Sequence, residues 1–335
     1  MFKRSLLTTA ILAGMVATSA HALSTSSTAT INYTNLSAID TAGGSSTTSP
    51  TATGTGSLSK FDTSLGVLTG VSLSAGYGST GFFRSTVPQS GTASSLENLS
   101  FLSGSSTLTS WSGSASLSST NNTGVTPSLS LASGTSSWAS QAALAQFASG
   151  SAGSLGISGN AKAIADNTGS GGQVHAKLGA HSTSVTATYD YVSHANASFD
   201  GSVDTNSLSL TAGSGFDVYA LGLASSTATM DAVSLTCTSG DCAAFDVSLA
   251  AFNDVAAGSS LSGLSSILAT AAGTYNAVYT LTFTDDTAVG VGQKQNSLTL
   301  NLTGTVVAVP EPESAALFLA GLLAMGSLSR RRRND

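Results

Sequence analysis

Apolar residues alternate with serine, threonine and other polar residues along much of the chain. Alternation with a period of two places one face of a β-strand in a core and the other face in water. Four stretches show the pattern most clearly: Val67, Val71 and Leu73; Val185, Ala187, Tyr189 and Tyr191; Tyr279, Leu281 and Phe283; and Leu298, Leu300, Leu302 and Val306. Short strands with polar, glycine-bearing turns between them predict an all-β protein with one or two antiparallel β-sandwich domains.

The last two of these stretches are separated by turn signals, Asp285-Asp286 and the glycine-bearing residues 290–296. We therefore expect them to form an antiparallel hairpin with a loose connection. Phe245, Val247 and Leu249 indicate another strand, which enters a turn at residues 256–258.

Three segments depart from the alternating pattern. Residues 138–148 follow Ser136 and Ser137, which could cap a helix, and predict a short helix or turn over a sheet edge. Residues 41–56 and 104–126 are rich in Ser, Thr and Gly and predict long loops or flexible segments.

The strand pattern extends over two regions with a soft boundary near residues 200–205. We assign residues 23–204 to a first β-domain and residues 205–308 to a second, whose length of about 100 residues fits an immunoglobulin-like sandwich. Whether the β region is one domain or two stays open at this point.

The N-terminus has the features of a secretory signal peptide, assigned to residues 1–22. Lys3 and Arg4 precede an uncharged run over residues 6–19, and Ala20 and Ala22 place small residues where signal peptidase cleaves. The mature chain would begin at Leu23. A retained membrane helix or a buried helix is the alternative, but the apolar run is short for a permanent span, which needs about 18 residues.

The C-terminus carries three features in order: Pro310-Glu311-Pro312, an apolar run over residues 315–328, and Arg330, Arg331, Arg332 and Arg333. Proline cannot donate a backbone hydrogen bond and favours an extended backbone before it, which keeps this segment open to a processing enzyme. The apolar run would be about 21 Å long as a helix, short of the roughly 30 Å hydrocarbon core. We expect a short transmembrane helix that serves as a temporary anchor, with the arginines as a cytoplasmic stop-transfer signal.

This order of features over residues 309–333 resembles the PEP-CTERM sorting domain of Gram-negative bacteria. The resemblance assigns residues 309–335 to a sorting signal and implies that an exosortase, a membrane enzyme, processes the chain. The other processing partner would be signal peptidase. The protein would be anchored transiently in the inner membrane and then reach the cell surface or the exopolysaccharide matrix.

A second resemblance lies at residues 58–71, which look like the opening motif of the choice-of-anchor E domain, a β-rich module of surface-anchored proteins. Weaker similarity at residues 144–147 and 185–191 extends it over about residues 24–195. That family has no established activity, so the resemblance implies fold and location only. Within the motif we expect Phe61 and Leu65 to anchor the core, Gly66 to adopt a conformation closed to larger residues, and Asp62 to cap a turn.

The surface predicted for the mature chain is weakly charged and acidic. Charged residues make up 8% of the chain, against about 25% in an average soluble domain. Without the terminal segments, and with cleavage after Pro312, 5 of the 11 basic and 15 of the 17 acidic residues remain, a net charge of −10. This balance argues against nucleic acid or anionic lipid and favours a divalent cation or a neutral polysaccharide as partner.

Cys237 and Cys242 are the two cysteines of the chain. In an exported protein they predict a disulfide bond across a hairpin loop, with free thiols or a metal pair as alternatives. Its stabilising effect would be small, because so short a loop has little closure entropy to remove.

The search for catalytic motifs finds no convincing site. Residues 76–81 match the spacing of a dinucleotide-binding loop, but no helix is predicted after them. The nucleophile elbow and the His-Glu-x-x-His motif are both missing from the sequence. We therefore assign no catalytic residue, no metal and no cofactor.

Two further groups of residues are weaker candidates for a functional site. One is the set of possible ligands or hydrolase residues His175, His181, His194, Asp190 and Asp200, which are more often solvated or locally bonded. The other is a calcium site at Asp285-Asp286, where EF-hand spacing is missing and a turn is the simpler interpretation.

Two classes of function remain: a non-enzymatic structural or interaction protein of the cell surface or exopolysaccharide matrix, and an exported enzyme acting on matrix polysaccharide. A glycosidase needs two carboxylates in a cleft and aromatic platforms. The mature chain offers only Glu97 and Glu311 as glutamates, and two tryptophans. The first class is therefore our expectation.

Overall fold

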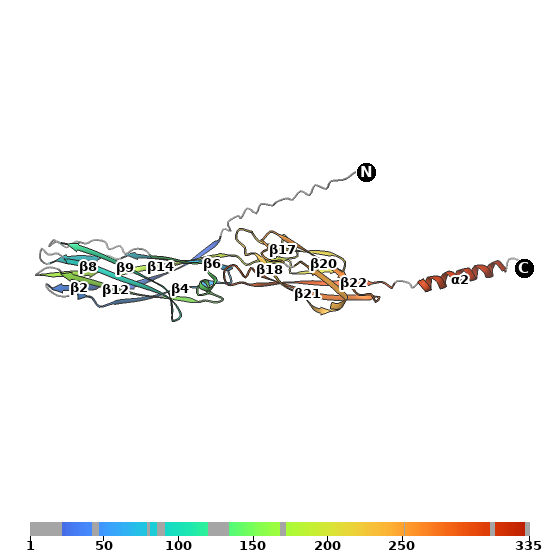
Figure 1. Ribbon diagram of the computed structural model, residues 1–335, viewed down its shortest axis with the longest axis horizontal. Coiled ribbons are helices and arrows are strands. Elements are labelled where there is room, and N and C mark those ends of the chain that lie inside the picture. Colours follow the sequence, from blue (N-terminus) through green and yellow to red (C-terminus); the bar gives the residue numbers. More distant parts are fainter. Residues whose placement is uncertain are drawn as a thin grey trace, which may run out of the picture.

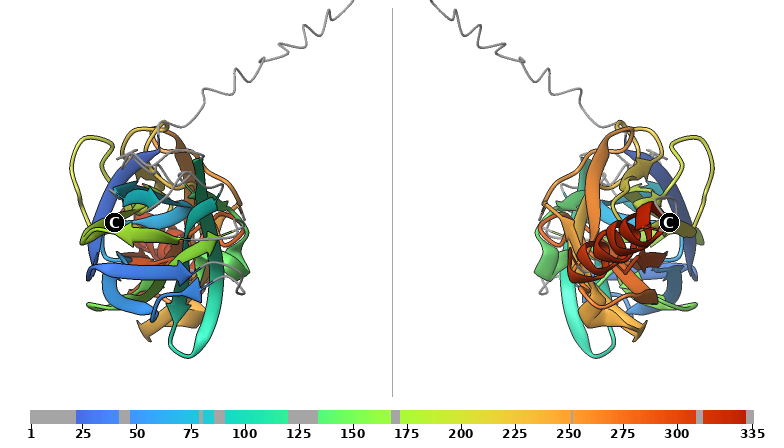
Figure 2. Two further views of the ribbon diagram at one scale, coloured as in Figure 1. Left: turned by 90° about the vertical axis from the view of Figure 1, so that its left-hand side faces the viewer. Right: turned by 90° about the vertical axis from the view of Figure 1, so that its right-hand side faces the viewer.

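The protein consists mostly of β-strands arranged in two consecutive sandwiches. The computed structural model describes residues 22–41, 47–78, 81–85, 91–119, 134–167, 172–250, 252–308 and 312–331. Figure 1 shows an elongated molecule in which the two sandwiches and the C-terminal helix follow one another along the long axis. The end views in Figure 2 show how narrow the molecule is across that axis.

The first sandwich is built from three sheets and one small strand pair. One layer is a four-stranded sheet in the order β1-β14-β6-β10, continued beyond breaks in the strands by a three-stranded sheet in the order β2-β13-β7. The other layer has β12 at its centre, paired with β8 on one side and with β3 and β4 on the other, while β9 pairs with β8. The strands are β1 (Leu23–Tyr33), β2 (Leu36–Thr41), β3 (Thr47–Thr48), β4 (Ala52–Ser59), β5 (Phe61–Asp62), β6 (Val67–Gly78), β7 (Gly81–Ser85), β8 (Gly91–Ser103), β9 (Ser106–Ser119), β10 (Gly134–Trp138), β11 (Ala148–Ser149), β12 (Ser154–Asn167), β13 (Gln173–Leu178) and β14 (His181–Val192).

The second sandwich pairs two four-stranded sheets, in the orders β15-β17-β20-β19 and β16-β22-β21-β18. Its strands are β15 (Asn196–Ser198), β16 (Ser207–Thr211), β17 (Gly215–Leu221), β18 (Met230–Gly240), β19 (Phe245–Leu249), β20 (Ser260–Ile267), β21 (Gly273–Asp285) and β22 (Gln295–Val306), with a 3-10 turn, η1 (Cys242–Ala244), before β19. The predicted hairpin is confirmed, since β21 and β22 pair antiparallel from Gly273–Val306 to Thr284–Gln295. Two pairs depart from the expected antiparallel pattern: β16 with β22, and β5 with β11.

Each sandwich has its own hydrophobic core. In the first, Val71, Leu73, Val185, Ala187 and Tyr189 of one layer are all buried, as their shared parity predicted. They face Leu58, Leu99, Phe101, Leu155 and Ile157 of the other layer. The second core contains Tyr279, Leu281, Phe283, Leu298, Leu300 and Leu302, also with the predicted parity. Ala197 and Phe199, which lie before the boundary placed at residues 204/205, pack in this second core.

The structure corrects the prediction of long Ser/Thr/Gly loops. Residues 52–59 form β4, which pairs with β12, and residues 106–119 form β9, which pairs with β8 over almost its whole length. The remainder of the two predicted loops includes residues 42–46 and 120–126, which lie outside the described residues. Composition alone favoured a loop, but a neighbouring strand supplies the hydrogen-bond partners that make a Ser-rich segment extended.

The predicted helix at residues 138–148 is much shorter than the pattern suggested. Helix α1 (Gln141–Leu144) has four residues and starts after Ser140. The expected capping residues, Ser136 and Ser137, lie instead in β10. Leu144 is buried, so the short turn serves to place one apolar side chain in the first core.

The turn that follows β5 confirms two of four expectations and corrects a third. Phe61 is buried in the first core, with 1% of its surface exposed. Asp62 caps the turn, since its Oδ1 accepts the Ser64 N–H at 2.9 Å, and this bond holds the pKa of Asp62 below its ordinary value. Leu65 is not a core anchor, because it is a turn residue and remains 49% exposed.

The fourth position, Gly66, must be a glycine because the main chain at Val192 comes too close for a side chain. A Cβ at this residue would lie 2.1 Å from the Val192 carbonyl oxygen. Val192 ends β14, so Gly66 lets this turn approach the segment that leaves the first sandwich.

The sequence predicts a loose connection between β21 and β22. In the structure this connection docks onto the first sandwich. Val291 forms an isolated antiparallel bridge with Leu68 of β6, with N–H···O distances of 2.9 and 3.0 Å. The side-chain Nε2 of Gln141 donates to the Thr287 carbonyl at 2.8 Å. Three segments contact one another here: this loop (residues 286–294), the turn at residues 63–66 and the linker at residues 192–195. We call this region the joint.

Candidate functional site

The C-terminal tail is separate from both sandwiches. Strand β22 ends at Val306, and helix α2 (Pro312–Arg331) begins at Pro312, where proline suits the first turn because its missing N–H needs no partner. Residues 316–326 of this helix are all exposed, among them Leu317, Phe318 and Leu323. The helix therefore presents apolar side chains that no part of the described fold covers.

We expected a short transmembrane helix in this tail. Within the described ranges, no helix combines the length and the apolar character needed to cross a membrane. Pro310 and Glu311 of the sorting motif lie outside the described residues, as do Arg332 and Arg333. Arg330 and Arg331 are the last residues of α2.

At the other end, Ala22 is exposed and directly precedes β1. Ala20 and the rest of the predicted signal peptide lie outside the described part of the chain. The first residue of β1 is Leu23, where we place the mature N-terminus.

The five histidine and aspartate residues considered as a cluster belong to different environments. His175 is on β13, and His181 and Asp190 are nine residues apart on β14, a separation of about 30 Å along a strand. Asp200 caps a turn by accepting the Ser202 N–H at 2.9 Å and the Ser202 hydroxyl at 2.7 Å, which lowers its pKa. These positions do not bring the residues together as one site.

His181 belongs to a buried polar group inside the first sandwich. Its Nε2 lies 3.5 Å from Oε2 of Glu97, and the ring stacks on Tyr33 with 4.8 Å between ring centroids. Glu97 Oε1 accepts the Thr183 hydroxyl at 2.6 Å. Burial alone would lower the pKa of His181, but the Glu97 carboxylate and the Gly179 carbonyl outweigh it and raise the pKa.

His194 lies in the joint, together with Asp285 from the end of β21. The His194 Nδ1 is 2.7 Å from Asp285 Oδ2, and its Nε2 is 2.8 Å from the Thr63 carbonyl oxygen. Asp285 is buried and also accepts the N–H groups of Ala195 at 2.6 Å and Lys294 at 2.8 Å. Both oxygens of Asp285 therefore accept hydrogen bonds from the protein, and Asp285 is not part of the group of carboxylates that Asp286 joins.

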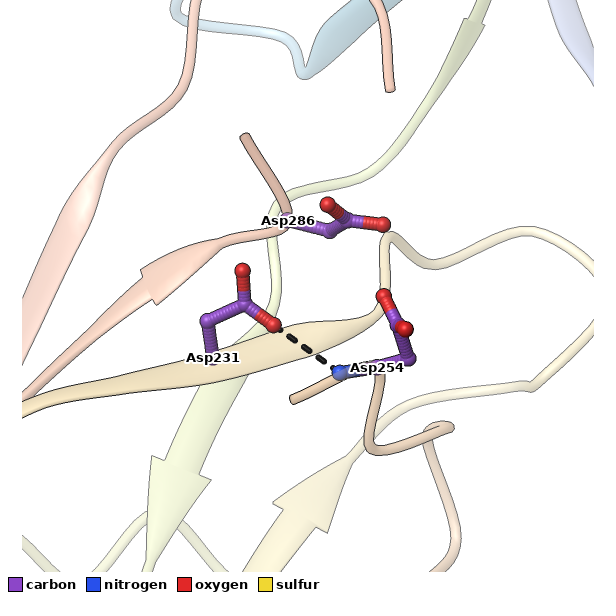
Figure 3. Close-up of side chains that lie close together, drawn as sticks. All are labelled: Asp231, Asp254 and Asp286. Carbon is purple, nitrogen blue, oxygen red and sulfur yellow. Dashed lines mark hydrogen bonds between the residues drawn. The ribbon is translucent and has the colours of Figure 1, made fainter. Parts of the chain in front are cut away.

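Asp286 belongs instead to a group of three carboxylates that the sequence analysis did not find. Asp231, Asp254 and Asp286 each offer an oxygen within 4.8 Å of the others (Figure 3). They come from β18, from a loop before β20 and from the joint loop, so no spacing in the sequence links them. Carboxylate oxygens are ligands that calcium accepts, but three residues alone do not complete its six to eight ligands.

The electrostatics of this group are unfavourable at neutral pH. A hydrogen bond with Asp286 and the repulsion of its charge raise the pKa of Asp254, with smaller contributions from burial and from Asp231. Asp254 also has a positive φ of 58°, a conformation that only Gly, Asn and Asp adopt readily, and its N–H donates to Asp231 Oδ1 at 2.9 Å.

Replacing Asp254 by Asn is expected to stabilise the protein slightly at pH 7 and less at pH 4. The folded chain binds a proton at Asp254 more tightly than the unfolded chain does. The contribution of Asp254 to the free energy of unfolding therefore falls as the pH rises from its ordinary pKa of 3.8 through its raised pKa in the folded chain. Asn keeps the side-chain size and tolerates the backbone conformation. Thermal midpoints across this pH range measure the effect.

Asp217→Asn is the matched control, because Asp217 lies on β17, outside the group of three carboxylates, and accepts the Ser262 hydroxyl at 2.6 Å. A wild-type-like pH profile for the Asp254 variant would contradict the assignment of repulsion to this group.

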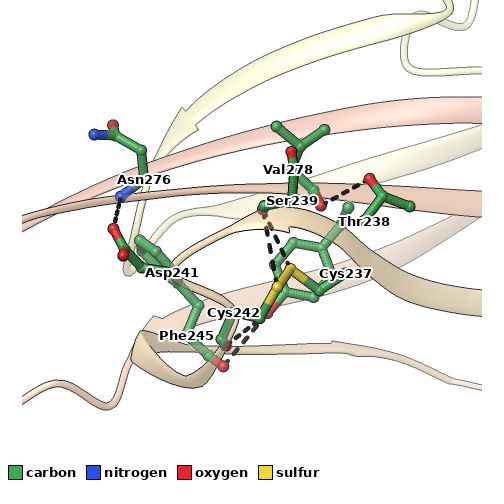
Figure 4. The surroundings of a disulfide bond; sticks show 9 residues. Cys237, Thr238, Ser239, Asp241, Cys242, Phe245, Asn276 and Val278 are labelled. Atoms are coloured by element: carbon green, nitrogen blue, oxygen red, sulfur yellow. Dashed lines mark hydrogen bonds between the residues drawn. A yellow bond between two sulfur atoms is a disulfide. The ribbon is translucent and has the colours of Figure 1, made fainter.

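The two cysteines are joined by a disulfide bond between the end of β18 and η1 (Figure 4). The loop that it closes is held further by Asp241, whose Oδ2 accepts the Asn276 N–H at 3.0 Å. The Thr238 hydroxyl donates to the Val278 carbonyl at 3.2 Å. The disulfide closes the turn after β18, and these hydrogen bonds hold the end of β18 against β21.

A polar pocket of about 470 Å³ opens beside the joint. His194, Asp204, Lys294 and several side-chain amides line it, including those of Asn196 and Asn206. Among the described residues that line it there is no Phe, Tyr or Trp.

Comparison with known proteins identifies the tail. Residues 308–333 match the family model described as the PEP-CTERM protein-sorting motif. The motif marks an exported protein that an exosortase processes and that is transiently anchored in the membrane. A search of curated proteins finds no match to the chain.

Proposed function

We propose that the mature chain is a non-enzymatic structural or interaction protein of the cell surface or exopolysaccharide matrix of a Gram-negative bacterium. One observation carries this proposal. The last strand of the second sandwich ends at Val306, and the sorting motif begins at residue 308. Removal of the tail would leave both hydrophobic cores complete, as expected for a tail that serves delivery while the sandwiches act after release.

The elongated arrangement of the sandwiches supports an extended surface protein (Figure 1). The first sandwich would be a choice-of-anchor E-like domain, on the resemblance at residues 58–71. The polar pocket beside the joint offers side-chain amides, which suit a neutral hydroxyl-bearing partner such as a polysaccharide better than a strongly charged one.

An enzyme acting on polysaccharide is the less favoured alternative. Glu97 is 1% exposed, and the Thr183 hydroxyl occupies one of its oxygens. A carboxylate in this position cannot reach a polymer chain outside the sandwich. Purified protein is expected to release no reducing sugar from the exopolysaccharide of its host.

Replacing Pro310 and Pro312 together by Ala is expected to stop release and to leave full-length protein in the inner membrane. The apolar helix would remain, but the extended, proline-marked segment before it would be lost. Cell fractionation and the mass of the released chain measure the effect, with an exosortase-deficient strain as reference. The variant should match that strain.

Pro50→Ala is the matched control, because Pro50 lies in an exposed connection between β3 and β4. It should be processed and released normally. If the Pro310/Pro312 variant is released like the wild type, the tail does not function as a sorting signal. A released protein that fractionates identically in strains with and without exopolysaccharide would count against the matrix role alone.

A further inference from the structure

Both ring nitrogens of His194 face hydrogen-bond acceptors. Nδ1 faces the carboxylate of Asp285 at 2.7 Å, and Nε2 faces the main-chain carbonyl of Thr63 at 2.8 Å. A carbonyl oxygen can only accept, and an ionised carboxylate can only accept. A neutral imidazole has one N–H donor, so both contacts are hydrogen bonds only when the ring carries two protons and a positive charge.

The two contacts belong to different sandwiches. Asp285 is the last residue of β21 in the second sandwich, whereas Thr63 follows β5 in the first. The side chain of Asp285 is fully buried and that of His194 is 14% exposed. A buried carboxylate holds the proton on the nitrogen that it faces. Deprotonation therefore removes the proton from Nε2, which is the one that bonds to the first sandwich.

We propose that His194 is a proton-dependent latch that fastens the second sandwich to the first. In acidic surroundings the charged ring bonds to both sandwiches and the joint is stiff. In alkaline surroundings the Nε2 lone pair faces the Thr63 carbonyl, this contact becomes repulsive, and the joint loosens. This inference concerns the mechanics of the exported protein and does not depend on its matrix role.

The other charged groups near the ring are consistent with this mechanism. Asp285 faces Nδ1 of the ring at 2.7 Å. Asp204 and Lys294 line the pocket that His194 also lines, and they carry opposite charges. On the side of the first sandwich, the carboxylate of Asp62 is engaged by the Ser64 N–H, so it does not replace Thr63 as a partner.

The neighbouring contacts of the joint provide the readout. Leu68 and Val291 exchange two main-chain hydrogen bonds across the joint, and Val67, Val192 and Ala228 form a small buried cluster beside them. Loss of the hydrogen bond from His194 Nε2 should make the hydrogen bonds between Leu68 and Val291 open more often, so that their amides exchange with solvent. The cores of the two sandwiches should stay protected.

The test is amide hydrogen exchange of the purified protein between pH 5 and pH 9, corrected for the intrinsic pH dependence of exchange. Protection of the Leu68 and Val291 amides should fall about tenfold toward alkaline pH, as for the loss of one charge-assisted hydrogen bond. The amide of Leu300 in the second core should not change. His194→Gln should abolish the step, and His175→Gln on β13, as matched control, should keep it.

Nitrogen-15 shifts of the His194 ring in the wild-type protein test the protonation state directly, even if the variant folds poorly. Both nitrogens should carry protons on the acidic side of the titration, and Nδ1 alone on the alkaline side. A ring that is singly protonated at pH 5, or a pH step of equal size in His194→Gln, would overturn the proposal.

Discussion

Replacing Phe61 by Ala is expected to destabilise the first sandwich by about 3–5 kcal/mol, the usual cost of removing a buried aromatic side chain. Phe61 packs against Tyr191 with 5.2 Å between ring centroids and against Tyr189 at 6.1 Å. Its N–H also donates to the Phe147 carbonyl at 2.9 Å, so it ties α1 and β11 to the core. Denaturant unfolding of the purified protein measures the loss.

Leu65→Ala is the matched control, four residues away in the same motif. Because Leu65 is 49% exposed, its replacement should change the free energy of unfolding by about 0.5 kcal/mol or less. Equal effects of the two substitutions would show that this turn is not placed as described.

The second large effect is expected at the joint. Replacing Gly290 by Ala would place a Cβ 2.1 Å from the Leu68 carbonyl oxygen, at a φ of 63° that disfavours any side chain. The loop must then move away from β6, which breaks the two hydrogen bonds between Leu68 and Val291. At about 1 kcal/mol each, these bonds add about 2 kcal/mol to the strain of the left-handed backbone.

Gly258→Ala separates the two costs, because Gly258 has a φ of 88° with no atom within 4 Å of the added Cβ. This control should show the backbone strain alone, about 1–2 kcal/mol. The Gly290 variant should in addition lose exchange protection at Leu68 and Val291. Retained protection there would mean that the loop does not dock on the first sandwich.

The joint is the part of the molecule that the sequence predicted least well. Asp285 and Asp286 are adjacent and chemically identical, and we assigned both to one turn or calcium site. The fold buries Asp285 against His194 and turns Asp286 toward Asp231 and Asp254. Partners 32 or more residues away make this distinction, and no local pattern records them.

The tail shows the opposite case. Its proline pair, apolar run and arginines follow one another in the chain. The family model matches residues 308–333, almost the same segment as the one inferred from the sequence. Local order is sufficient for this prediction because the features that define the motif follow one another directly in the chain.

The sequence by itself determined the β-class of the protein, the faces of its principal strands and the sorting tail. Parity along a strand predicts its buried face because the backbone alternates its side chains whatever the partners are. Only the tertiary structure decided which Ser-rich segments became strands, that Leu65 stayed exposed, and that His194 bridges two sandwiches. These outcomes depend on hydrogen-bond partners and packing surfaces contributed by residues distant in the chain, which no local pattern of polar and apolar positions contains.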